Sequence, residues 1–61
     1  MTRKSVSEPQ RKAIFLALVK AQDGGAALAE SRKMIAQQFG LDEQQVRSIE
    51  KEGLDNSWPP L

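Results

Sequence analysis

Four polar side chains in the C-terminal half of the chain recur at the three- and four-residue spacings of a helix face, and no acidic residue shares that face. If this segment is helical, the spacing places all four on one side. Glutamine and arginine make bidentate hydrogen bonds with adenine and guanine edges, and serine and lysine suit base or phosphate contacts. The pattern therefore predicts a DNA-reading face, with an ordinary solvated helix face as the alternative. The predicted base-contacting residues are Gln44, Arg47, Ser48 and Lys51.

Basic side chains elsewhere could contact DNA phosphates. Residues 1–20 hold five basic side chains and one acidic, a net charge of +4, whereas residues 21–61 hold four basic and seven acidic, a net charge of −3. A basic N-terminal segment suits a polyanionic partner. Because the segment with the DNA-reading face is itself acidic, we expect weak, salt-sensitive binding by the isolated domain. The predicted phosphate contacts are Arg3, Lys4, Arg11, Lys12, Arg32 and Lys33.

The composition excludes several classes of site. The 61 residues include no cysteine and no histidine, which rules out a disulfide framework, a zinc finger and a Ser-His-Asp or Cys-His catalytic site. So short a chain has little room for a deep pocket. We therefore expect no enzyme, no cofactor and no metal. The longest apolar run, Ala13–Val19, is too short to span a membrane, and no export signal is visible, which predicts a cytoplasmic protein.

Capping signals and hydrophobic periodicity predict three helices. Ser7 and Gln10 have the spacing of a capping box, and so have Asp42 and Gln45. Within the third helix, acidic and basic residues four positions apart, Glu43 and Arg47, are expected to pair. The predicted helices span about residues 8–22, 27–39 and 42–52.

Glycines mark the expected helix ends, because glycine adopts the left-handed C-terminal conformation easily. Asp23-Gly24-Gly25 follows the first helix, Gly40 the second and Gly53 the third. The second helix could begin near residue 26, or only at residue 32 with Ser31 as its cap. The longer version is favoured because it places Leu28, Ile35 and Phe39 on one face. The other predicted core residues are Ile14, Phe15, Leu18 and Val19 in the first helix, Leu41, and Val46 and Ile49 in the third.

The last eight residues cannot be helical beyond Trp58, because two prolines follow it. The segment holds three large apolar residues, so we expect an ordered, non-helical tail that folds back onto the helices. The alternative is an exposed Trp-Pro-Pro-Leu peptide that docks into a partner. Folding back is favoured, because a domain this small has little other apolar surface to bury. The three residues are Leu54, Trp58 and Leu61.

The spacing of small and branched residues matches a helix-turn-helix. A small residue at Ala36 lets the two helices cross closely, Gly40 permits the sharp turn, and Val46 and Ile49 seat the outer helix on the core. The first helix would cover the pair. A plain three-helix bundle without a nucleic-acid role is the alternative. The predicted organisation is a flexible basic tail at 1–6 and one all-α, three-helix helix-turn-helix domain at 7–61.

Residues 32–54 also resemble a known family. Phe39-Gly40-Leu41, a four-residue gap, Val46-Arg47-Ser48-Ile49-Glu50 and then Gly53-Leu54 resemble region four of bacterial RNA polymerase sigma factors, and Ile35-Ala36 fits the helix before the turn. The resemblance implies that helix 42–52 enters the major groove with Arg47 facing DNA beside Gln44, Ser48 and Lys51. It implies either a DNA-contacting or a structural role for Glu50. Sigma factors continue with a basic stretch where this chain has Asp55–Leu61, so we expect a stand-alone domain that shares this element.

Two functions follow from these patterns. The first is a small bacterial DNA-binding protein that regulates transcription, with double-stranded DNA as its partner. It would act as a homodimer or tethered to another protein, because one recognition helix covers only a half-site. The second is a protein-interaction module that docks to RNA polymerase or to a larger regulator without binding DNA. The acidic C-terminal half and the Trp-Pro-Pro-Leu segment favour the second.

Overall fold

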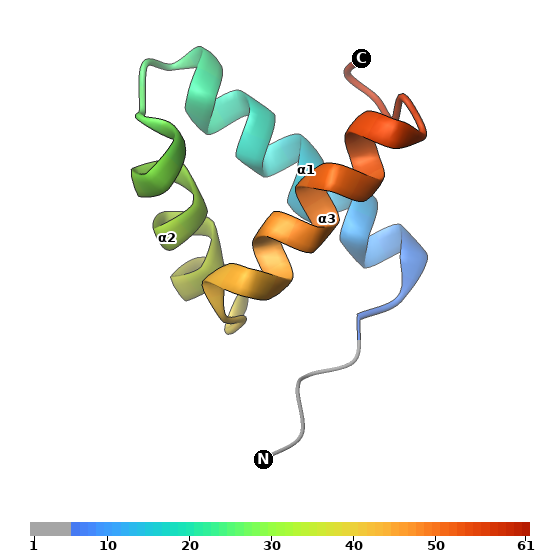
Figure 1. The fold of residues 1–61 in the computed structure, drawn as a ribbon, viewed down its shortest axis with the longest axis horizontal. Helices are drawn as coiled ribbons and strands as arrows, with labels where there is room; N and C mark the ends of the chain where they lie inside the picture. The colour runs from blue at the N-terminus through green and yellow to red at the C-terminus, as the bar shows by residue number, and fades with distance from the viewer. Residues whose placement is uncertain (1–5) are drawn as a thin grey trace.

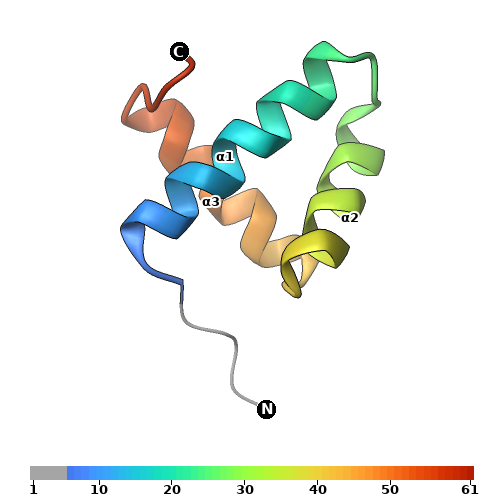
Figure 2. The same ribbon diagram turned by 180° about the vertical axis from the view of Figure 1, so that it is seen from behind.

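The computed structural model describes residues 6–61, which form three α-helices and no strand. Each helix contacts the other two. Figures 1 and 2, which view the molecule from opposite sides, show α1 and α3 crossing and α2 at one end of the pair. The predicted all-α, three-helix architecture is therefore confirmed. None of the helices in this part of the chain is long and apolar enough to cross a membrane. The helices are α1 (Glu8–Asp23), α2 (Leu28–Phe39) and α3 (Glu43–Asp55).

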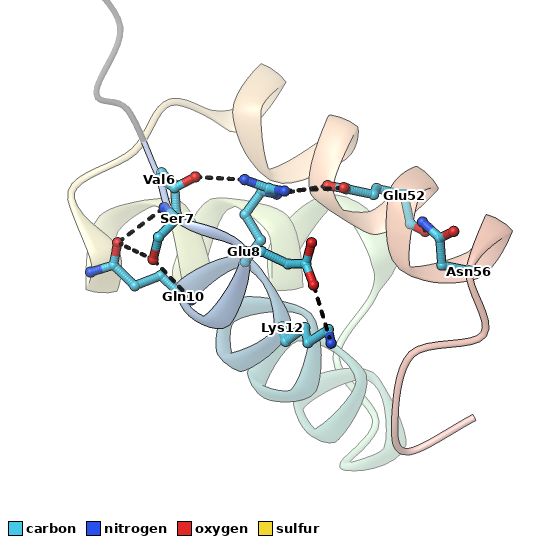
Figure 3. A network of polar contacts seen from close by, with 8 residues as sticks. Val6, Ser7, Glu8, Gln10, Lys12, Glu52 and Asn56 are labelled. Atoms are coloured by element: carbon cyan, nitrogen blue, oxygen red, sulfur yellow. Dashed lines mark hydrogen bonds and ion pairs between the residues drawn. The ribbon is translucent and has the colours of Figure 1, made fainter.

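Both predicted capping boxes are present. At α1, the Ser7 Oγ accepts from the Gln10 backbone N–H at 3.4 Å, and the Gln10 Oε1 accepts from the Ser7 N–H at 3.3 Å (Figure 3). At α3, the Asp42 Oδ1 accepts from the Gln45 N–H at 2.8 Å, and the Gln45 Oε1 accepts from the Asp42 N–H at 3.3 Å. These bonds satisfy N–H groups that have no partner within the helix. They fix where both helices begin.

The start of α2 differs from the prediction in two details. The helix begins at Leu28, close to the longer predicted version, so the shorter alternative with Ser31 as cap is wrong. Ser31 lies inside the helix and is fully buried, and its hydroxyl donates to the Leu28 carbonyl at 2.8 Å. Leu28 itself is 56% exposed rather than in the core. It shares the predicted face, but it lies in the first turn of α2, and α3 begins at the opposite end of that helix (Figure 1).

The core lies between the three helices. Ala36 is buried, as a small residue must be where two helices cross closely. Val19, Phe39 and Leu41 are partly buried and pack against the edge of the core. The predicted apolar faces are confirmed in all three helices, with Leu28 as the exception. The buried apolar residues are Ile14, Phe15, Leu18, Ile35, Ala36, Val46, Ile49 and Trp58.

Gly40 and Gly53 have different roles. Gly40 ends α2 as predicted, in the left-handed conformation with φ of 68°. Gly53 does not end α3, because the helix continues to Asp55. A Cβ atom at Gly53 would clash with three ring atoms of Phe15 on α1. Glycine therefore serves close packing at this position, and the predicted end of α3 at this residue is wrong.

Trp58 is buried, with 7% of its surface exposed. Its ring packs edge-on against Phe15, with centroids 6.2 Å apart and an angle of 81° between the planes. The Trp58 backbone N–H donates to the Gly53 carbonyl at 3.0 Å, which holds the residue beside the last turns of α3. The indole is therefore not presented to solvent. Leu54 and Leu61, which the sequence predicted to fold back with Trp58, are instead exposed.

Candidate nucleic-acid interface

The four predicted base-contacting residues line one open depression of about 470 Å³. All except Ser48 have side chains long enough to reach beyond the helix surface, and all four are exposed. Arg32 of α2 lines the same depression from the other helix. Two helices thus contribute polar side chains to one concave surface. Its lining residues are Arg32, Gln44, Arg47, Ser48, Glu50, Lys51, Leu54 and Asp55.

Arg47 and Lys51 differ in whether they form an ion pair. The Lys51 Nζ lies 3.1 Å from the Asp55 Oδ2 in an exposed pair four residues apart. Arg47 forms no ion pair within residues 6–61, so the predicted pair with Glu43 is absent. An exposed pair of this kind contributes only about 0.3–0.5 kcal/mol, so its absence costs α3 little stability. The Arg47 guanidinium therefore has its donors available for a ligand.

Arg32 is held in place by Glu50 of α3. The Arg32 Nε and Nη2 lie 2.9 and 2.8 Å from the Glu50 Oε1. The Gln22 Nε2 of α1 donates to the Glu50 Oε2 at 3.2 Å and to the Ser31 Oγ at 3.3 Å. These contacts join all three helices beside the depression. The sequence did not predict this network, because its members come from three helices and no spacing along the chain connects them.

Arg11 and Lys12, two predicted phosphate contacts, do not line the depression. The Arg11 Nε and Nη2 donate to the two Glu52 carboxylate oxygens at 2.8 and 3.3 Å, and the Nη1 donates to the Val6 carbonyl at 2.6 Å (Figure 3). The Lys12 Nζ lies 3.4 Å from a Glu8 oxygen and 5.9 Å from the centroid of the Trp58 ring. Both cations thus contribute to contacts within the domain.

Three further predicted phosphate contacts are Arg3, Lys4 and Lys33. Lys33 is exposed on α2 but is not among the residues that line it. Arg3 and Lys4 lie outside the described residues. Val6, which the prediction assigned to the N-terminal tail, is half-buried and packs against the core. Of the six predicted phosphate contacts, the structure therefore places Arg32 beside the predicted base-contacting residues.

A second, smaller hollow of about 90 Å³ lies where the start of α1 meets the end of α2. It is mainly apolar and offers little hydrogen-bonding capacity to a polar ligand. Within residues 6–61, no three acidic side chains gather in a way that could hold a metal ion. The lining residues are Val6, Gln10, Ala13, Ile14, Phe39 and Leu41.

No protein-family model, curated protein or solved structure matches this chain. The resemblance of residues 32–54 to region four of sigma factors therefore stays a prediction from the sequence.

Proposed function

We propose that this protein is a small DNA-binding regulator of transcription in which α2, the turn at residues 40–42 and α3 act as a helix-turn-helix. The observation that carries the proposal is the shared depression, where the four predicted base-contacting residues of α3 meet Arg32 of α2. A three-residue turn that contains glycine is typical of this motif. The resemblance to region four of sigma factors supports the same conclusion.

The dimensions of α3 suit the major groove. Its 13 residues extend over about 20 Å, and the groove is about 12 Å wide and admits an α-helix. In this motif the N-terminal residues of the second helix contact base edges. Gln44 and Arg47, which lie in the first half of α3, would then address bases. Lys51 and Arg32 would contact phosphates on either side.

Two acidic residues of α3 oppose DNA binding less than the sequence suggests. Glu50 is paired with Arg32, and Glu52 is paired with Arg11. Each carboxylate therefore has a positive partner within about 3 Å, which reduces its repulsion of phosphate at longer range. The depression itself contains three basic and two acidic side chains, so it carries a small positive charge.

The test is an NMR titration with a mixed-sequence DNA duplex, first at low salt and then at physiological salt. We expect shifts at the depression that weaken as salt rises, because phosphate attraction is strongest at low salt. Arg47→Gln should weaken binding by about 1–3 kcal/mol and leave the unfolding free energy within about 0.5 kcal/mol of the wild type. The residues expected to shift are Arg32, Gln44, Arg47, Ser48 and Lys51.

Lys20→Gln is the matched control, since it removes one exposed positive charge from α1. It should weaken binding much less than Arg47→Gln. Equal losses for the two variants would mean that only net charge matters, and no shifts at low salt would rule out DNA as the partner.

A protein-docking module is the second candidate. The observation in its favour is Leu54, which is 57% exposed and lines the same depression. Under this proposal, a partner such as RNA polymerase or a larger regulator would cover Leu54, and Leu54→Ser would abolish binding while Arg47→Gln would not. Trp58→Ala cannot separate the two functions, because Trp58 belongs to the core. Binding of DNA that survives Leu54→Ser but is weakened by Arg47→Gln would favour the first proposal.

A further inference from the structure

Glu50 is an acidic residue in a surface that we assign to DNA. Its side chain is 13% exposed, and both carboxylate oxygens are engaged. The Oε1 contacts Arg32, and the Oε2 accepts from Gln22. Arg32 and Gln22 thus use three of the roughly four acceptor positions of this carboxylate, and with the side chain mostly buried little capacity remains to accept from a cytosine amino group.

The contact with Glu50 restricts Arg32. It uses the Nε and Nη2 edge of the guanidinium, so the Nη1 is left to donate elsewhere. A free arginine side chain has many rotamers, and ordering it opposes binding. An arginine that is already ordered loses less freedom when it meets its ligand. Because Arg32 lines the depression, holding it in one position reduces the entropy that is lost when a ligand binds there.

We infer that Glu50 is a positioning residue that holds Arg32 as a phosphate contact of α2, and that Glu50 itself reads no base. The inference rests on the proposed function, and it specifies the chemical group that Arg32 meets, a phosphate of the duplex backbone. If the inference holds, Glu50 raises the affinity for DNA, whereas an ordinary acidic residue at the surface lowers it. Removal of a bystander carboxylate reduces repulsion and strengthens DNA binding, whereas removal of Glu50 weakens it.

Glu52 provides a matched control. It lies on the same helix and also accepts from an arginine of another helix, but neither Glu52 nor Arg11 lines the depression. Glu50→Gln and Glu52→Gln therefore remove the same charge from similar ion pairs. Only the first of these pairs lies in the depression assigned to DNA.

The experiment measures the affinity for a mixed-sequence duplex over a range of salt concentrations. We expect Glu50→Gln and Arg32→Gln each to weaken binding about threefold at low salt and to reduce the salt slope by up to about 0.9, the value for one phosphate contact. The double variant should bind no more weakly than Arg32→Gln alone. Glu52→Gln should bind as tightly as the wild type or slightly more tightly.

Equal or tighter binding by Glu50→Gln, compared with Glu52→Gln, would overturn the inference. Arg32→Lys is the second variant, in case Glu50→Gln fails to fold. It keeps the charge but loses the two-pronged contact with Glu50, so it should also weaken binding, and wild-type affinity would contradict the inference.

One measurement needs no DNA. In the free protein, the Arg32 Nε–H NMR signal should be that of a restrained arginine and should become that of a mobile one in Glu50→Gln. A mobile Arg32 in the wild type would overturn the positioning role on its own. Failure of the wild type to bind the duplex at low salt would instead refute the proposed function, and with it the role of Arg32 as a phosphate contact.

Discussion

The two sides of α3 make different kinds of contact. On the side that packs against α1, Gly53 approaches Phe15 so closely that no side chain fits between them, and Trp58 covers the same ring. On the side that faces the depression, Arg47 has no ion-pair partner within residues 6–61. The stability of the packed side depends on the fit between side chains. Any ligand binding at the open side would depend on charge and hydrogen bonding. Substitutions should therefore separate stability from ligand binding.

The largest expected effect is that of Trp58→Ala on the packed side. Removal of a buried aromatic ring costs about 3–5 kcal/mol, and a domain of this size has little more than that in total. We expect the variant to be mostly unfolded at 25 °C, as measured by far-ultraviolet circular dichroism. Leu61→Ala removes an exposed side chain three residues later and should change stability by less than about 0.5 kcal/mol. Similar melting of both variants would show that Trp58 is not part of the core.

Gly53→Ala should have the second-largest effect. Alanine is the better helix former by about 1 kcal/mol, but its methyl group would overlap the Phe15 ring. Overpacking of this kind costs about 1–3 kcal/mol, so we expect a net loss of stability in urea unfolding. Gly24→Ala is the control, because a Cβ there meets neighbours only at 3.5 Å. A Gly53→Ala variant more stable than the wild type would mean that the ring can move aside.

The smallest effect is expected on the open side, for Asp55→Asn. The Lys51–Asp55 pair is exposed and contributes at most about 0.5 kcal/mol to stability. Loss of the carboxylate should raise the affinity for duplex DNA by less than about threefold at low salt, because it releases Lys51 and removes a negative charge from the depression. Asp23→Asn removes the same charge at the end of α1 and should raise the affinity less. Weaker DNA binding by Asp55→Asn would contradict the proposed role of the open side.

Local signals explain what the sequence could predict. Ser7 and Asp42 each act on residues within three positions, so the starts of α1 and α3 could be read directly from the chain. The polar face of α3 followed from helical spacing alone, and the structure brings its four members to one depression. Gly53 was misinterpreted because glycine at a helix end and glycine at a close approach look alike in a sequence. What separates them is Phe15, 38 positions earlier in the chain.

Contacts between helices explain what the sequence could not predict. Arg32 was expected to contact phosphate, but the sequence did not indicate that Glu50 restrains it. Leu28 had the right periodicity for the core, yet its position in the first turn of α2 leaves it exposed. In both cases the outcome depends on where helices lie relative to one another.

The position of Trp58 has a practical consequence for optical measurements. It is the only tryptophan in the chain, and its indole lies in the core rather than among the residues of the depression. Its fluorescence should therefore shift to longer wavelength when the core opens and water reaches the ring. Ligands bound at the depression should leave that emission nearly unchanged. The molecule thus carries an intrinsic reporter of folding, whereas a fluorescence assay of binding needs a label on the ligand.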